Sequence, residues 1–204
     1  IEDGGISVTC PDGTEPRARY LVDASGFRSP CAQKLGPREN PCRFEHHSRS
    51  LFTHLVNVPT DAALGHSRHE PPPVPGHSRT VHHVFERGRF GVVSFNNHKG
   101  PKKPWVRVGL RTDERTHPKT GMDIDAEFRE FTSRFLAEQQ QFAGATSVRP
   151  WVSTGRLQHS SQHSAGARWC LMSHAAGFLD PFFPHGLSNT VEVINVLARR
   201  LIDA

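Results

Sequence analysis

The chain has 204 residues, of which 35% are hydrophobic, 16 are proline and 17 are glycine, which allows one large domain or two small ones with long loops. Its formal net charge is +5, but the densest basic cluster, Lys99 to Lys103, holds only three lysines, so the charge does not indicate a nucleic-acid partner. No apolar run approaches the roughly 20 residues of a membrane-spanning helix, and we predict none. The four cysteines have no Cys-x-x-Cys spacing, and we expect reduced thiols and a cytoplasmic location.

The first 36 residues have the pattern of strands followed by a short helix. Two strand-like runs, residues 6–9 and 18–22, flank a turn at residues 11–14. The second run is continuously apolar, which predicts a strand buried in a parallel sheet. Residues 23–26 then leave the carboxyl end of that strand, where open α/β sheets bind ligands. Residues 29–35 predict a short helix with Ser29 as N-cap and Pro30 at its first position.

The middle of the chain predicts an antiparallel sheet of at least four strands. Residues 50–58 have strand composition, residues 80–86 and 89–95 form a hairpin, and residues 105–110 alternate apolar and polar side chains. Between them, residues 61–78 are rich in proline, histidine and glycine and predict a surface loop. Residues 126–142 predict one amphipathic helix capped by Asp123 or Asp125. Residues 148–157 predict the last strand of this region.

A strand, a tight turn and a helix are predicted near the C-terminus. Residues 169–172 are apolar, small residues follow at positions 175–177, and residues 187–202 have helical spacing. Such a junction presents free backbone N–H groups and the positive end of a helix dipole. It is suited to hold an anion or an electron-rich ring edge.

The 14 histidines do not predict a metal site. The neighbouring histidines at 46–47 and at 82–83 would point to opposite faces of a strand, so neither pair chelates by itself. His159 and His163 have helix-like spacing but lie in a stretch rich in serine, glutamine and glycine. We therefore expect no resident metal.

Two segments resemble the flavin-contacting motifs of FAD-dependent monooxygenases and flavin-dependent halogenases. Ser173 to Ala176, Asp180-Pro181 and Gly186-Leu187 are similar to the family's second motif, which runs Gly-Asp-Ala-Ala, Asp-Pro and then a glycine that opens a helix. Asp23 to Gly26 resembles the family's Asp-Ala-Ser-Gly strand end. The two motifs stand in the family's order, which strengthens the resemblance.

The resemblance implies an α/β (α+β) fold in which a partial, Rossmann-like FAD-binding unit carries an inserted, mainly antiparallel β-sheet substrate domain. The implied domains are 1–36 and 168–204 for the FAD-binding part and 37–167 for the substrate-binding sheet, which in the family roofs the cavity over the flavin. Family members begin with a Gly-x-Gly-x-x-Gly unit that this sequence lacks. We therefore expect an internal fragment or the product of an incomplete gene, inactive alone and purified without stoichiometric FAD.

The resemblance also implies site residues. The implied FAD contacts are Ala24, Ser25, Gly26, His174, Ala175, Asp180, Pro181, Gly186 and Leu187, and the substrate-side candidates are His185, Phe90 and Val92. His174 stands where the family has an acid, and a neutral imidazole can also donate or accept a hydrogen bond. The amides of Gly186 and Leu187 are expected at the pyrimidine edge of the flavin, and residues 23–26 are expected close to residues 175–186. No catalytic residue is assigned, because the family's catalytic lysine would lie upstream of Ile1.

As function, the resemblance implies an FAD-dependent oxidoreductase, and we favour a monooxygenase that uses a flavin hydroperoxide on an organic substrate, with aromatic compounds among the candidates. The alternative is a flavin-dependent halogenase. A flavin-dependent saturating reductase and a non-catalytic fragment are further alternatives. The expected partners are a small organic substrate and an external flavin reductase or NAD(P)H, without nucleic acid or membrane.

Two departures from the tryptophan halogenases favour oxygenation over halogenation. Residues 89–94, Arg-Phe-Gly-Val-Val-Ser, replace the family's Trp-x-Trp-x-Ile-Pro motif. Residues 183–186, Phe-Pro-His-Gly, replace its Glu-Ser-Thr-Gly run, so both the glutamate and the threonine are absent. We therefore predict no halogenation of free tryptophan and favour hydroxylation.

Overall fold

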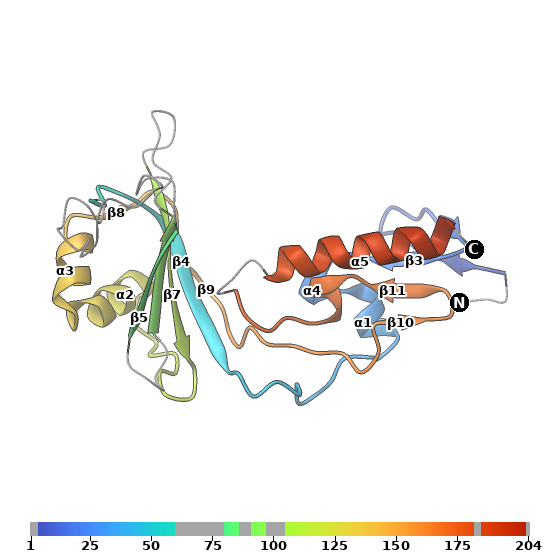
Figure 1. Ribbon diagram of the computed structural model, residues 1–204, viewed down its shortest axis with the longest axis horizontal. Helices are drawn as coiled ribbons and strands as arrows, with labels where there is room; N and C mark the ends of the chain where they lie inside the picture. Colours follow the sequence, from blue (N-terminus) through green and yellow to red (C-terminus); the bar gives the residue numbers. More distant parts are fainter. Residues whose placement is uncertain (1–3, 60–79, 86–90, 97–104, 182–184, 203–204) are drawn as a thin grey trace. The chain divides into compact units, whose positions relative to one another are not determined.

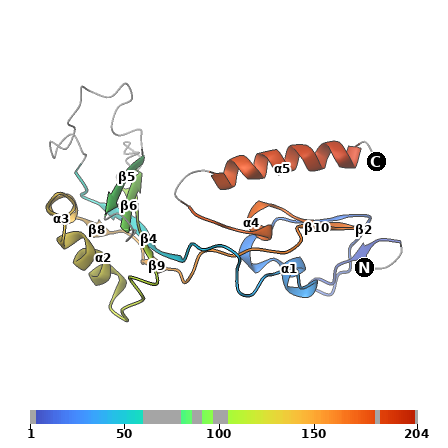
Figure 2. The ribbon, with the colours of Figure 1, turned by 60° about the horizontal axis from the view of Figure 1, so that its bottom comes forward.

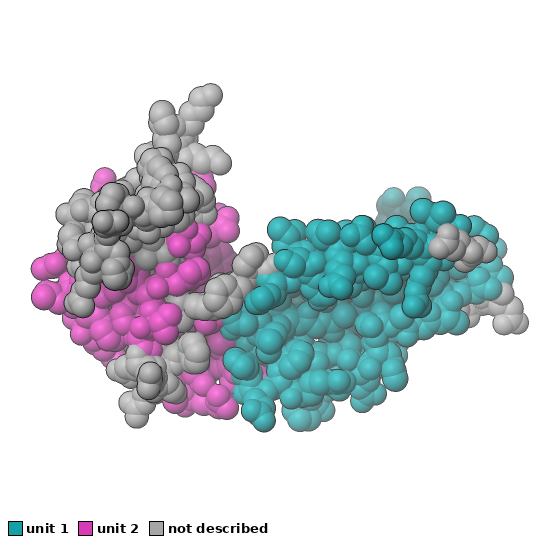
Figure 3. Space-filling view, in the orientation of Figure 1, with its two compact units in different colours: residues 1–46, 157–204 teal, residues 47–156 magenta. Residues whose placement is uncertain are grey.

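The computed structural model describes residues 4–59, 80–85, 91–96, 105–181 and 185–202. The chain forms two compact units, which Figure 3 colours separately. Unit 1 combines residues Ile1–His46 with Leu157–Ala204, and unit 2 comprises His47–Arg156. Both the mixed α/β fold class and the antiparallel sheet in the middle of the chain were predicted, and both are confirmed.

The described part of unit 1 contains a two-stranded hairpin, a three-stranded sheet and three α-helices (Figure 1). Strands β1 (Ile6–Ser7) and β2 (Arg17–Ala18) form the hairpin. In the sheet, β11 (Trp169–Leu171) lies between β10 (Ala165–Gly166), which is antiparallel to it, and β3 (Leu21–Asp23), which is parallel to it. The 3₁₀ helix η1 (Gly26–Arg28) and helices α1 (Pro30–Lys34), α4 (Ser173–Ala176) and α5 (His185–Ile202) complete the unit.

The parallel pairing predicted for the first long apolar run is confirmed, but the run is not one buried strand. Residues 17–18 belong to β2 and residues 21–23 to β3. Val22 is 40% exposed, so β3 buries only one of its sides. The short helix is as predicted: Pro30 opens α1, and the Ser29 hydroxyl accepts a hydrogen bond from the Ala32 amide.

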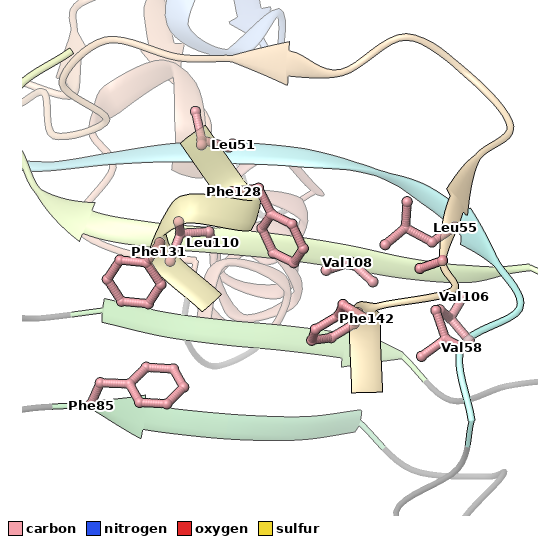
Figure 4. Close-up of a cluster of buried hydrophobic side chains, with 11 residues drawn as sticks. Leu51, Leu55, Val58, Phe85, Val106, Val108, Leu110, Phe128, Phe131 and Phe142 are labelled. Atoms are coloured by element: carbon pink, nitrogen blue, oxygen red, sulfur yellow. The ribbon is translucent and has the colours of Figure 1, made fainter. Parts of the chain in front are cut away.

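Unit 2 is a six-stranded antiparallel sheet with two helices on one face. The strand order is β5 (Thr80–Phe85), β6 (Gly91–Asn96), β7 (Val106–Asp113), β4 (Ser48–Val56) and β8 (Thr146–Ser147), and β9 (Val152–Ser153) also pairs with β4. Helices α2 (Ile124–Ser133) and α3 (Leu136–Phe142) supply Phe128, Phe131 and Phe142 to the core, which Figure 4 shows against the apolar residues of β4 and β7.

The register separates the two faces of this sheet. Leu51 pairs with Leu110 and Leu55 with Val106, and all four side chains lie in the core under the helices. Because side chains alternate along a strand, the neighbouring pairs Phe52–Gly109 and His54–Arg107 lie on the opposite face of the sheet.

A buried arginine joins the sheet to α2. Arg49 of β4 is 2% exposed and forms an ion pair with Glu127. Its Nε donates to the His117 carbonyl over 2.9 Å and its Nη2 to the Pro118 carbonyl over 3.2 Å. These contacts satisfy the guanidinium, as a buried charge requires.

The single helix predicted for residues 126–142 is wrong, because α2 ends at Ser133 and α3 begins at Leu136. The Thr132 and Ser133 hydroxyls donate to carbonyls of their own helix, at Phe128 and Glu130, which weakens a helix locally. Phe135 then takes an extended conformation and stacks on Phe85, with the ring centroids 4.0 Å apart. Asp123 rather than Asp125 is the cap, since its carboxylate accepts from the Ala126 amide.

The strand predicted for residues 148–157 is reduced to the two-residue β9, preceded by β8. Pro150 has no N–H group and interrupts pairing between them. The chain passes from one compact unit to the other at residues 46/47 and 156/157, and the predicted domain boundaries 36/37 and 167/168 lie within unit 1. Residues 37–46 and 157–167 pair with each other inside unit 1, through the bridge between Arg38 and Ser161 and the bond from the Gln162 amide to the Pro37 carbonyl.

Candidate functional site

The two segments that resemble flavin motifs meet at the carboxyl ends of two parallel strands. Leu171 pairs with Asp23 at the end of the β11–β3 ladder, and the Met172 amide donates to the Asp23 carbonyl over 2.9 Å. Residues almost 150 positions apart in sequence are thereby side by side. This edge of an open α/β sheet is where such folds bind ligands.

The Asp23 carboxylate organises the turn that follows β3. It is 6% exposed, and its Oδ1 accepts from the Ser25 amide and hydroxyl at 2.9 and 2.5 Å. Its Oδ2 accepts from the Ser29 hydroxyl at 2.7 Å and the Cys31 amide at 3.1 Å. Burial by itself would raise the pKa of Asp23, but these hydrogen bonds outweigh it and lower the pKa to about 2. Asp23 therefore stays ionised and fixes residues 24–31 around itself.

Arg38 connects η1 to α4. Its Nη2 donates to the Phe27 carbonyl over 2.9 Å, and its Nη1 donates to the Ala176 carbonyl and the Ser161 hydroxyl, both over 3.2 Å. The guanidinium also lies 5.8 Å from the centre of the Phe27 ring. One fixed, planar donor group thus holds both motif segments.

The His159 side chain contacts the backbone of α4. It is 8% exposed, its Nε2 lies 3.0 Å from the His174 carbonyl oxygen, and its ring packs edge-on against Phe27 at 5.0 Å. Burial lowers the pKa of His159, and the nearby Arg38 lowers it further, although its backbone hydrogen bonds oppose this. The imidazole is therefore a neutral structural contact.

The first turn of α5 packs against α4 (Figure 2). The Ser173 hydroxyl donates to the Gly186 carbonyl over 3.3 Å, and Ser173 has a positive φ of 23°. A Cβ atom placed on Gly186 would lie 2.6 Å from His174 Cε1, so any larger residue there would require the His174 ring to move. The first turn carries no acidic residue, and the positive end of the helix dipole favours an electron-rich group there.

The structure brings most of the predicted site residues together. Residues 24–26 enter η1, which packs against the α4 residues His174 and Ala175, and Gly186 contacts His174. The predicted proximity of residues 23–26 to residues 175–186 is thereby confirmed for the described residues. Asp180 and Pro181 lie in the segment after α4, and exposed His185 and Leu187 lie in the first turn of α5.

Two predicted residues are not part of this assembly as described. Phe90 falls outside the described residues. Val92 is on β6 in unit 2, where it pairs with Val84 and Arg111, and its side chain is outside the described set. Both remain substrate-side predictions.

Sequence reasoning did not find Arg38 and His159. Both lie in irregular segments without hydrophobic periodicity or a motif, so no local pattern marked them. The available signal was indirect: an arginine and a histidine in segments that flank the two motif regions.

Among the residues that the structure describes, no group of three histidine, cysteine, aspartate or glutamate side chains is placed to hold a metal. No described helix is both long and apolar enough to cross a membrane.

The geometry of unit 1 defines a class of protein. Two parallel strands end side by side, and the Asp-Ala-Ser-Gly turn follows one of them. The 18-residue helix α5 begins nearby, and its first turn contains no acidic residue. This is the ligand-binding edge of a Rossmann-like α/β unit.

Comparison with known sequences agrees with this class. No family model matches the chain. It is 52% identical over 206 aligned residues to tetracycline 7-halogenase of Kitasatospora aureofaciens, covering 100% of this chain and 37% of that protein. It is 45% identical to monodechloroaminopyrrolnitrin halogenase PrnC of Pseudomonas fluorescens, covering 98% of this chain and 35% of that protein. The chain therefore spans little more than a third of these relatives.

Solved structures give the same result. A variant of halogenase PltM in complex with FAD superposes with a TM-score of 0.88 at 28% identity, over 100% of this chain and 40% of that one. PltM in complex with phloroglucinol and FAD gives 0.86 at 28% identity. The flavin-dependent halogenase CmlS shares the fold, with a TM-score of 0.64 at 19% identity over 93% of this chain and 32% of that one. The predicted resemblance to FAD-dependent monooxygenases and flavin-dependent halogenases is therefore confirmed over this part of those proteins.

The Asp23 network makes a prediction about pH. Because the pKa of Asp23 is about 2 in the folded protein and about 4 when unfolded, its ionised form stabilises unit 1 above pH 4 by about 2 kcal/mol. This contribution is lost as the pH falls from about 4 to 2. We expect Asp23→Asn to destabilise unit 1 by about 2–3 kcal/mol at pH 7. The difference from wild type should vanish near pH 2, as measured by hydrogen exchange of the β3 and β11 amides.

The control for this experiment is Asp12→Asn. Asp12 also has a lowered pKa, from its hydrogen bonds to Thr14, but it lies in an exposed turn. Asp12→Asn should therefore change the stability of unit 1 little at any pH. A wild-type minus Asp23→Asn difference that stays constant down to pH 2 would contradict the assigned role of Asp23.

The contact between Gly186 and His174 makes a second prediction. Gly186→Ala should destabilise the protein while His174 is present, because the ring must move. In a His174→Ala background the same change should be neutral or stabilising, because alanine favours a helix by about 1 kcal/mol. Thermal unfolding of the four proteins should give a coupling of about 1–2 kcal/mol. Equal effects in both backgrounds would show that His174 does not occupy this space.

Proposed function

We propose that this chain contributes the second half of an FAD site in a flavin-dependent halogenase. Support comes from the halogenase relatives, from the FAD complexes of PltM, and from the convergence of two motif segments at the carboxyl ends of β3 and β11. Residues 24–26 and the first turn of α5 fit the cofactor, because most of these residues are exposed and the first turn of α5 carries no acidic side chain that would oppose an electron-rich ring.

Reduced FAD, when bound, supplies the activation of O₂ that halide oxidation requires. The chain's own contribution is binding and orientation. The first-turn amides of α5, at Gly186 and Leu187, would stabilise negative charge at the flavin edge. The hydrogen bonds of Asp23 and of the Arg38 guanidinium would hold the two binding segments in fixed positions relative to each other.

The comparisons support the alternative, halogenation, better than the favoured hydroxylation, since both sequence relatives carry the name halogenase. The motifs behind that preference belong to tryptophan halogenases, so their loss bears on the substrate and not on the halogenation step. The expectation that free tryptophan is not halogenated remains. Residues 89–90 and 183–184 of those motifs lie outside the described residues.

The substrate is proposed to be an aromatic organic molecule. The relatives' names include tetracycline and monodechloroaminopyrrolnitrin, and one PltM structure contains phloroglucinol. An external flavin reductase, or NAD(P)H, is the proposed source of reducing equivalents. The assignment of one part of the chain to FAD binding and of the sheet to substrate binding also belongs to this proposal.

The proposed reaction predicts bromide incorporation. The full-length protein should be supplied with reduced FAD, O₂, bromide and a panel of phenols, aryl pyrroles and free tryptophan. We expect at least one phenol or pyrrole product with the bromine isotope doublet in mass spectrometry, and none from tryptophan.

Parallel reactions without bromide, and without reduced FAD, are the controls. Products that gain one oxygen whether or not bromide is present would overturn halogenation in favour of oxygenation. Omission of reduced FAD should abolish the product, which would show that halogenation depends on the cofactor. A reaction of the same substrates with added hypobromous acid gives the products of non-enzymatic bromination for comparison.

A further inference from the structure

The imidazole of His174 lies against the first turn of α5. A Cβ atom built on Gly186 would lie 2.6 Å from His174 Cε1 and 2.7 Å from its Nε2, so this edge of the ring faces the backbone of Gly186. The Phe178 ring packs beside the imidazole, with centroids 5.1 Å apart, and the His174 carbonyl oxygen lies 3.0 Å from His159 Nε2. All of these contacts lie within unit 1. They hold His174 next to the backbone that the proposed function assigns to the flavin edge.

One nitrogen of this ring is available to gain a proton. The Ser173 hydroxyl donates to the Gly186 carbonyl over 3.3 Å, so its oxygen is left to accept from the Nδ1–H group of His174, 3.5 Å away. The other nitrogen, Nε2, faces Gly186 and makes no hydrogen bond with any residue that the structure describes. His174 is exposed, so protonation of Nε2 breaks no internal contact and buries no charge.

No carboxylate of the described residues forms an ion pair with His174. The titratable or charged side chains on the segments that contact or follow α4 are Arg28 of η1, Cys170 of β11, Arg38, His159, Asp180, and His185 and Glu192 of α5. Glu192 lies six positions after Gly186 and therefore on another side of α5. The Asp23 carboxylate already accepts four hydrogen bonds. Protonation of His174 therefore adds a positive charge beside the first turn of α5.

We propose that His174 sets the charge of the FAD site, so that its protonated imidazole stabilises the negative charge of the reduced flavin. This role rests on the proposed function, which seats the flavin edge at the first turn of α5, and it makes that site responsive to pH. Histidine is the side chain whose charge changes between about pH 5 and 8. As the pH falls through this range, the protein should bind reduced FAD more tightly relative to oxidised FAD.

The sign of the effect depends on which residue occupies position 174. The motif that this segment resembles has an acid there, and a carboxylate opposes negative charge on the flavin, whereas an imidazolium favours it. The Debye length is about 8 Å at physiological ionic strength, so a charge in contact with Gly186 acts on any charged group at the first turn. The FAD diphosphate has the same charge in both redox states. The reduction potential therefore reports on the flavin ring, and the affinity for oxidised FAD reports on the diphosphate.

The test is the reduction potential of FAD bound to the full-length protein, measured against a reference dye at about pH 6 and about pH 8.5, within and above the range in which histidine titrates. His174→Asp introduces the acid of the motif, and His174→Gln keeps a polar side chain that carries no charge. At the lower pH, His174→Asp should weaken the binding of reduced relative to oxidised FAD by about tenfold, which lowers the potential by about 30 mV for a two-electron couple. His174→Gln should lower the potential less at the lower pH and leave it unchanged at the higher pH.

Arg17→Gln is the matched control, since it also removes a positive charge from an exposed residue of unit 1. Arg17 lies in β2, before the amino end of β3, whereas the candidate FAD site lies at the carboxyl end of β3. Arg17→Gln should leave the potential unchanged at both pH values.

Three outcomes would contradict the role of His174. Equal potentials in the wild type and both His174 variants at the lower pH would overturn it while leaving FAD binding intact. Weaker binding of oxidised FAD by His174→Asp, with an unchanged potential, would show that the charge acts on the diphosphate instead. A full-length wild-type protein that binds no FAD would overturn the proposed function and this role together.

Discussion

Unit 1 depends on one buried carboxylate. Asp23 ends a strand that is parallel to β11, and its two oxygens accept four hydrogen bonds from Ser25, Ser29 and Cys31. An ionised group with little exposure is stable only when satisfied in this way, so the turn at residues 24–31 has little freedom to rearrange. At the same strand end, the Asp23 carbonyl accepts a hydrogen bond from the Met172 amide. Arg38 links η1 to α4 through hydrogen bonds to the Phe27 and Ala176 carbonyls. The candidate FAD site is thus assembled by polar contacts more than by its small apolar core.

Much of this fold could be predicted from local sequence. Apolar runs predicted strands where β3, β4, β5, β6, β7 and β11 lie, and Ser29-Pro30 predicted the start of α1, because these signals act over a few neighbouring residues. The proximity of the two motif segments followed from the resemblance, as parallel strand ends share one edge. The break between α2 and α3 was missed, since it depends on side-chain bonds at Thr132 and Ser133 and on the stacking of Phe135 on Phe85, a residue of another element.

The remaining features come from contacts that no local pattern encodes. Arg38 and Ser161 are 123 positions apart, and His159 acts through a carbonyl of a different segment. Gly186 also has a structural role that the sequence did not indicate, because its missing side chain makes room for His174; its predicted contact with a flavin stays a prediction. Likewise, the pairing of His54 with Arg107 requires the register of β4 against β7.

The central claim is that two segments distant in sequence bind one FAD at the edge formed by β3 and β11. Hydrogen exchange with mass spectrometry on the full-length protein, with and without saturating FAD, tests it most directly. The account predicts that FAD protects residues 24–31 and residues 173–190 together, with the same dependence on FAD concentration, while α2 and α3 are unchanged. Protection confined to one segment, or to neither, would contradict it.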